Sequence, residues 1–135
     1  MRRIRTAIAL LGMPLFVLLG STPASAAASI DVTSGTLVVR GVAVDLTISV
    51  ACPAGRSGSF ELVLRQRSGN RIAYGSGWAP VGCTGAPQEV TGRVWAATEG
   101  AVFRSGEALV TGSTELCGQD TCEYGQIDDT VRVTH

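Results

Sequence analysis

Histidine is almost missing from this 135-residue chain, and its scarcity excludes several kinds of enzyme. The one histidine is His135, the last residue. A Ser/His/Asp or Cys/His arrangement needs an internal histidine to transfer protons near neutral pH. Glycoside hydrolysis needs two opposed carboxylates in a cleft, whereas the acidic residues here fall mostly at outward strand positions or in turns. Because no glycine-rich phosphate motif precedes a helix either, we expect no catalytic residues, no cofactor and no enzymatic activity.

Long apolar runs are missing from the chain except near its beginning. Three arginines precede an apolar run over residues 7–19, and the small residues Ala-Ser-Ala follow at 24–26. This order of basic, apolar and small residues is typical of a cleaved secretory signal peptide. We therefore predict a signal peptide at 1–26, a single domain at 27–135, and a secreted protein without a membrane span.

Positive charge is also scarce in the predicted domain. Lysine is absent, and three of the eleven arginines lie in the signal peptide, so eight arginines face eleven acidic residues and the net charge is about −3. Phosphate binding requires a basic surface. We therefore expect no nucleic acid among the partners.

No helical period is found after residue 26; apolar and polar residues alternate strictly over 42–52, again over 59–67, and less regularly in the other segments. A period of two is typical of a strand that buries one face. The side chains expected to face the core share an apolar character and fall at every second position: Val42, Val44, Leu46, Ile48, Val50 and Cys52 in one segment, and Phe60, Leu62 and Leu64 in the next.

Further strands are expected at 71–78, from 90 to near 99–100, at 107–116 and at 126–134, and Ser34-Gly35 indicates a kinked first strand or a tight hairpin. About seven short strands separated by glycine-rich turns are typical of an immunoglobulin-like sandwich. The predicted fold class is therefore all-β, an immunoglobulin-like antiparallel β-sandwich of about seven strands.

Four cysteines in an exported chain predict two disulfides. Successive antiparallel strands finish at alternate ends of the domain, so the strand that ends at Cys52 and the one that leads to Cys83 finish at the same end. The strands that flank Cys117 and Cys122 meet at that end as well. We therefore expect the bridges Cys52–Cys83 and Cys117–Cys122, both at one end of the sandwich.

The stretch "ELCGQDTCEYG" around the second pair admits three interpretations. A redox centre usually has two residues between its cysteines and a helix to lower the thiolate pKa, and this stretch has four residues and no helix. A structural zinc site requires four Cys or His ligands. The spacing favours a disulfide that closes a hairpin, and we expect no metal.

Aromatic residues are few, and three of them suit a binding surface. In the alternating pattern of its strand, Trp95 falls at an outward position next to the inward Val94. Tyr74 and Trp78 lie on a neighbouring segment. Exposed aromatic side chains on a sheet can form a recognition patch. A shift of register by one residue would instead place Trp95 in the core. Gln119 and Asp120, in the loop closed by the second disulfide, are further candidate ligand-binding residues.

Charged residues gather in two places. Four acids near the last hairpin offer oxygen ligands of the kind that calcium takes, but their spacing matches no known calcium loop and favours a solvated turn. They are Glu115, Asp120, Glu123 and Asp128. Three arginines surround one hairpin and form either a charged face that prevents pairing with other chains or a patch for an anionic ligand; they are Arg65, Arg67 and Arg71.

The motif "CGQDTC" between the last two strands resembles the late disulfide hairpin of the neocarzinostatin family. The resemblance implies a seven-stranded immunoglobulin-like apoprotein that shields a small chromophore in a cleft beside such hairpins. The resemblance assigns a structural role to Cys117 and Cys122. The family's other disulfide closes a short loop in the middle of the chain, whereas Cys52 and Cys83 are far apart in this sequence. The chain also resembles the small secreted immunoglobulin-like proteins of high-GC Gram-positive bacteria.

These observations predict a secreted, monomeric, non-enzymatic binding module for an extracellular protein, glycan or small molecule. Loops on a rigid sandwich commonly carry such sites. The alternative is an apoprotein of the neocarzinostatin kind that sequesters a small molecule, which predicts a deep cleft at the end that carries the disulfides.

Overall fold

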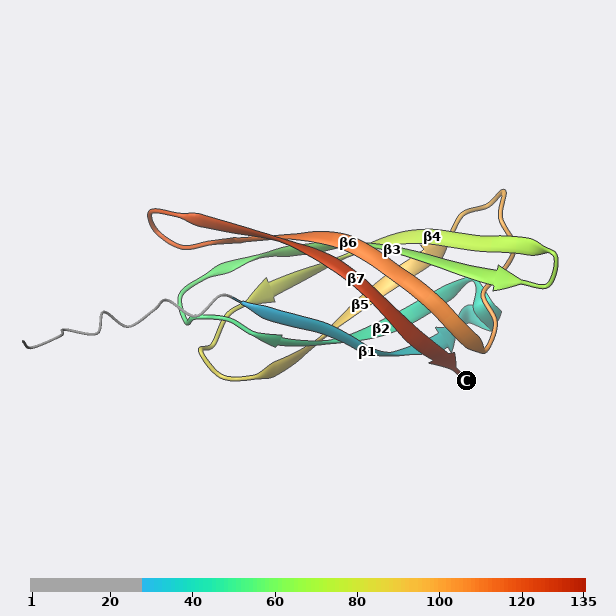
Figure 1. The fold of residues 1–135 in the computed structure, drawn as a ribbon, viewed down its shortest axis with the longest axis horizontal. Coiled ribbons are helices and arrows are strands. Elements are labelled where there is room, and N and C mark those ends of the chain that lie inside the picture. Colours follow the sequence, from blue (N-terminus) through green and yellow to red (C-terminus); the bar gives the residue numbers. More distant parts are fainter. Residues whose placement is uncertain (1–27) are drawn as a thin grey trace, which may run out of the picture.

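The computed structural model describes residues 28–135, so the predicted signal peptide lies outside the described residues. Seven strands and one short 3-10 turn make up the fold (Figure 1), and the described residues contain no α-helix. The all-β class is therefore confirmed. The elements are β1 (Ser29–Val38), η1 (Val39–Gly41), β2 (Ala43–Ala51), β3 (Ser57–Ser68), β4 (Arg71–Gly82), β5 (Gln88–Ala96), β6 (Gly106–Cys117) and β7 (Cys122–Thr134).

The predicted alternation places the core correctly over most of β2 and β3. The apolar residues at every second position are fully or almost fully buried, and they include Leu46, Ile48, Phe60 and Leu62. The prediction was wrong at Val42, which is 40% exposed. Its backbone is helical, because it completes the turn of η1, and the alternation therefore begins one residue later with β2.

The seven strands form one closed barrel in the order β1-β2-β5-β4-β3-β6-β7, and this finding corrects the expectation of two separate sheets. Two short seams close it. The strands β4 and β5 pair only over residues 75–78 and 93–96, and β1 pairs in parallel with β7 only at Gly35 and Thr36. Alternating sequence patterns identify strands but not their neighbours, which is why these seams could not be foreseen.

The first strand is kinked, in agreement with one of the two expectations for Ser34-Gly35. The register of β1 against β2 shifts between Val32 and Ser34, so that β1 bends while it stays paired with β2. Gly35 occupies a buried inward position, where a Cβ atom would lie 3.2 Å from the side chains of both Val44 and Val133. A small residue is needed here because the β1 backbone comes close to the core.

Both disulfides form with the predicted partners, Cys52–Cys83 and Cys117–Cys122. They lie at the same end of the barrel, where β2, β4 and β6 finish (Figure 1). The first is buried, and the second closes the β6–β7 hairpin at its last pair. The stretch that admitted three interpretations is therefore a disulfide-closed hairpin. No helix in the described part of the chain is long and apolar enough to cross a membrane.

Candidate ligand-binding surfaces

Tyr74, Trp78 and Trp95 lie together on the outside of the barrel, and we call these three residues the aromatic strip. Their exposed fractions are 40%, 60% and 50%, respectively. In the pairing of β4 with β5, Trp95 is opposite Ser76. It therefore lies diagonally between Tyr74 and Trp78, within the range at which aromatic side chains interact across strands. The predicted outward direction of Trp95 is confirmed.

An ion pair lies beside Trp95 in the middle of the aromatic strip. Arg93 donates two hydrogen bonds to the Asp45 carboxylate, from Nε at 2.6 Å and from Nη2 at 2.8 Å. The guanidinium carbon of the same arginine lies 5.8 Å from the centre of the Trp95 ring, within the range of a cation–π contact. Hydrogen bonding to Arg93 and its positive charge lower the pKa of Asp45, against the opposing effect of partial burial. This chain of contacts restricts the Trp95 side chain before any ligand arrives.

The other sequence-predicted binding residues, Gln119 and Asp120, lie elsewhere. They are exposed at the tip of the β6–β7 hairpin, at the disulfide end and beyond the last pair of that hairpin. The aromatic strip lies on β4 and β5, so the structure divides the predicted set between two surfaces.

The acids near this hairpin do not form one cluster. Glu123 pairs with Arg56 and accepts a hydrogen bond from the Ala28 backbone, and Glu115 accepts one from the Tyr124 hydroxyl at 3.4 Å. Within residues 28–135, the single group of three potential metal ligands that lie within 4.8 Å of one another is Glu115 with Cys117 and Cys122. Because both sulfurs belong to the disulfide, this group offers one carboxylate. The arrangement is that of a solvated turn.

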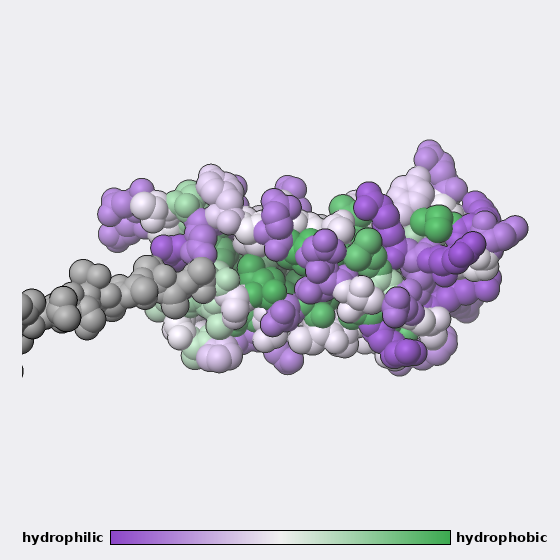
Figure 2. All heavy atoms as spheres, in the orientation of Figure 1, coloured by the Kyte–Doolittle hydropathy of each residue, from purple (hydrophilic) through white to green (hydrophobic). Residues whose placement is uncertain are grey.

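Of the three arginines around the β3–β4 hairpin, Arg67 and Arg71 lie beyond the ranges over which β3 pairs with β6 and β4 pairs with β5, and Arg65 does not. Arg65 lies where β3 pairs with β4 on one side and with β6 on the other. Arg71 donates a hydrogen bond to the carbonyl of Glu99 in the following loop. Figure 2 shows hydrophilic side chains gathered at this end of the barrel. Both expectations for these arginines, a charged strand edge and a patch for an anionic ligand, therefore stay predictions.

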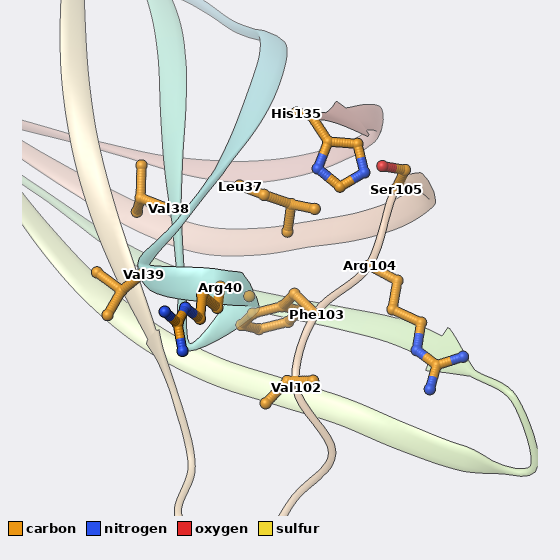
Figure 3. Close-up of a pocket in the computed structure, with 10 residues that line it drawn as sticks. Leu37, Val38, Val39, Arg40, Val102, Phe103, Arg104, Ser105 and His135 are labelled. Carbon is orange, nitrogen blue, oxygen red and sulfur yellow. The ribbon is translucent and has the colours of Figure 1, made fainter.

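A pocket lies at the same end, opposite the disulfides. It has a volume of about 570 Å³. Three segments line it: Leu37 to Gly41 at the corner between β1 and β2, residues 102–105 of the loop before β6, and His135. Figure 3 shows the Phe103 ring between Arg40 and Arg104. A second depression of about 160 Å³ lies over β3, β6 and β7 and has a mostly polar lining that includes Glu61 and Glu115.

Two buried polar side chains of β3 hold the loop that forms one wall of the pocket. The Gln66 amide donates to the Arg104 carbonyl at 2.7 Å and accepts from the Arg104 N–H at 2.8 Å. The Ser68 hydroxyl donates to the Val102 carbonyl. Gln66 and Ser68 are only 4% and 6% exposed, so these bonds form in the protein interior, where they are strong. The loop is therefore a fixed wall.

The opposite wall has a strained backbone. Val39, Arg40 and Gly41 all adopt positive φ angles, of 49°, 55° and 84°. This conformation is rare for a β-branched residue, and such positions cost about 1–3 kcal/mol and cluster at functional sites. Only glycine fits at position 41, since a Cβ atom there would lie 2.3 Å from the Phe103 carbonyl oxygen. The N–H of Phe103 donates to the Gly41 carbonyl at 2.8 Å and joins the two walls.

Sequence reasoning missed this pocket. One signal was available, because the inward series Phe60, Leu62 and Leu64 continues to Gln66 and Ser68. A polar side chain at a core-facing strand position needs an internal partner. That partner is a loop whose path no local pattern reveals.

Comparison of the chain with protein-family models, with characterised proteins and with solved structures finds no match. The functional argument therefore depends on the surfaces described above.

Proposed function

We propose that this protein is a secreted, non-enzymatic binding module that recognises a glycan through the aromatic strip. The observation that carries the proposal is which aromatic residues of the protein are exposed and which are buried. Both tryptophans and both tyrosines of the chain are exposed, whereas Phe60 and Phe103 are in the core. Tryptophan and tyrosine combine an apolar ring with a polar group, which suits a wet recognition surface.

The size and shape of the aromatic strip favour an oligosaccharide over a protein partner. An aromatic side chain buries about 200 Å² when fully covered, so three that are half exposed offer about 300 Å². A stable protein interface needs about 800 Å² on each side. Tyr74 and Trp78 are four residues apart along β4, a distance of about 13 Å. A short oligosaccharide has a comparable length, and the C–H faces of its rings stack on aromatic rings.

Polar groups beside the aromatic strip supply partners for sugar hydroxyls. Ser76 lies opposite Trp95, and Glu61 of β3 lies opposite Trp78. The Arg93 guanidinium is half exposed next to the same rings. Because sheet strands hold all these groups, the surface loses little conformational freedom on binding, which favours affinity.

Two features support the wider setting of the proposal. Two disulfides fit an oxidising extracellular location, in agreement with the predicted signal peptide. We also infer an immunoglobulin-like topology, since only short seams join β1-β2-β5 to β4-β3-β6-β7. For the neocarzinostatin-like alternative, the expected cleft belongs at the disulfide end, whereas the larger pocket lies at the other end.

The test is tryptophan fluorescence titration with soluble cello-, chito-, manno- and xylo-oligosaccharides. We expect at least one of them to change the emission, and we expect Trp78→Ala and Trp95→Ala each to weaken its binding by about tenfold, which corresponds to about 1.4 kcal/mol. The matched control is Tyr124→Ala, because Tyr124 is 71% exposed but lies on β7, outside the aromatic strip. This variant should bind as the wild type does. A failure of all four sugars, or an equal loss in the control, refutes the proposal.

A further inference from the structure

The pocket opposite the disulfides combines an apolar lining with positive charge. Its walls include Leu37, Val39, Val102 and Phe103. Val39 and Val102 are 56% and 44% exposed, although most other valines of the strands are in the core. Apolar side chains that face one hollow on a fixed framework are typical of a preformed ligand site.

All the ionisable side chains that line this pocket are basic or neutral. They belong to Arg40, Arg104 and His135, and no acidic residue contributes to the lining. This distribution is unusual here, because acids outnumber arginines by eleven to eight over the described residues. Figure 3 shows Arg40 and Arg104 on opposite sides of the Phe103 ring. Their side chains point away from each other in this view, so an anionic group at the pocket would lie beside one of the two guanidinium groups.

The neighbouring surface strengthens the attraction for an anion. The β3–β4 hairpin adds Arg67 and Arg71, whereas Arg132 at the end of β7 lies opposite Glu107 of β6. Charges of one sign around a hollow raise the local concentration of counter-ions and direct their approach. The aromatic strip lies outside the pocket, so the two surfaces do not share a lining residue.

The backbone of the pocket is fixed before binding. Gln66 and Ser68 hold the wall formed by residues 102–105, and the bond between Phe103 and Gly41 joins it to the strained corner. The positive φ of Val39 and Arg40 is maintained although neither residue is glycine. A backbone conformation that the residue type disfavours is often found at ligand-binding sites.

We propose that this pocket binds a single-chain anionic amphiphile, with its apolar chain against Leu37, Val39 and Val102 and its anionic head at the rim beside Arg40 or Arg104. The chemical class follows from the two properties of the lining: an apolar floor selects the chain, and the positive charge of the arginines selects a carboxylate, sulfate or phosphate head. This site is independent of the glycan surface.

The test is isothermal titration of the protein, expressed as the full chain, with three probes below their aggregation limits. Decanoate supplies both chain and head, decyl maltoside supplies an uncharged head on the same chain, and acetate supplies the head alone. We expect decanoate to bind at least about tenfold more tightly than either of the others, because only decanoate meets both properties of the lining. Equal binding of decyl maltoside, or no binding of decanoate, overturns the proposal.

Variants locate the site. Arg40→Gln, Arg104→Gln and Val102→Ser should each weaken decanoate binding by about fivefold or more. The matched controls are Arg56→Gln, which removes a charge at the disulfide end, and Leu109→Ser, which removes an exposed apolar side chain outside the pocket lining. Both controls should bind decanoate as the wild type does, and an equal loss in the controls contradicts the assignment.

One further arm separates a dissolved ligand from a membrane surface. The protein is mixed with vesicles of phosphatidylglycerol and, separately, with vesicles of phosphatidylcholine, and sedimentation measures the bound fraction. We expect sedimentation to remain low with both. Strong sedimentation with the anionic vesicles, together with no binding of monomeric decanoate, overturns the pocket proposal in favour of a membrane-docking end.

Discussion

Gln66 holds the wall of the pocket by two hydrogen bonds, and Ser68 holds it by one. Replacement of Gln66 by leucine tests how much these two bonds stabilise the protein. Leucine has a similar volume and no polar atoms. The change therefore removes both hydrogen bonds to the Arg104 backbone, at 2.7 and 2.8 Å, with little change in packing. It leaves one N–H and one C=O group of the loop without their internal partner.

The expected loss follows from these two bonds. A hydrogen bond in a protein contributes about 1 kcal/mol, so their removal should lower the free energy of unfolding by about 2 kcal/mol. For a domain of this size, that loss corresponds to a fall of about 8 °C in the melting temperature. Ser68→Ala removes one bond, to the Val102 carbonyl, and should lower the free energy by about 1 kcal/mol.

Urea unfolding followed by circular dichroism measures the free energies, and hydrogen exchange reports on the loop itself. A local loss of about 2 kcal/mol should accelerate exchange of the Arg104 amide by about thirtyfold. A Gln66→Leu variant within about 0.5 kcal/mol of the wild type, with unchanged exchange at Arg104, would refute the reasoning.

Two more perturbations have expected outcomes. Replacement of Cys52 and Cys83 by alanine should lower the free energy of unfolding by about 4 kcal/mol by the chain-entropy model, because the sequence separation is 31 residues. Opening the hairpin disulfide, with a separation of 5, should cost about 2 kcal/mol, and an inverted order in urea unfolding would contradict the model. For Asp45→Asn, the depressed pKa of Asp45 means that its bond to Arg93 stabilises the fold above the ordinary pKa of 3.8. The variant should therefore be less stable than the wild type at pH 7, and the difference in stability should decline as the pH falls through the lowered pKa. Thermal unfolding of both proteins from pH 7 to pH 2 measures this difference. A difference that stays constant over this range would be inconsistent with this account.

The strands could be predicted from the sequence because they depend on the local alternation of apolar and polar residues. The disulfides could be predicted because their positions follow from the number of turns between the cysteines. The alternation around Leu46 and Leu62 reports directly which face is buried. The reversal of direction at each turn then brings Cys52 to Cys83 and places both bridges at one end. The exposure of Trp95 followed from the same alternation.

The closure of the barrel and the pocket could not be predicted in this way. Closure depends on the seam between residues 75–78 and 93–96, where Gly75 and Gly77 admit the backbone of β5. A Cβ atom at Gly77 would lie 2.1 Å from the Arg93 carbonyl oxygen. The pocket depends on a loop held by contacts between residues far apart in sequence, and on left-handed backbone at Val39 that its residue type disfavours.

The central claim is that the aromatic strip is the recognition surface, and nuclear magnetic resonance tests it most directly. The protein labelled with nitrogen-15 is titrated with the oligosaccharide that gives the largest fluorescence change. The account predicts shifts of both indole N–H signals and of the Tyr74 amide, with the amides of residues 117–122 unchanged. Shifts confined to that hairpin, or to the pocket residues 37–41 and 102–105, would contradict it.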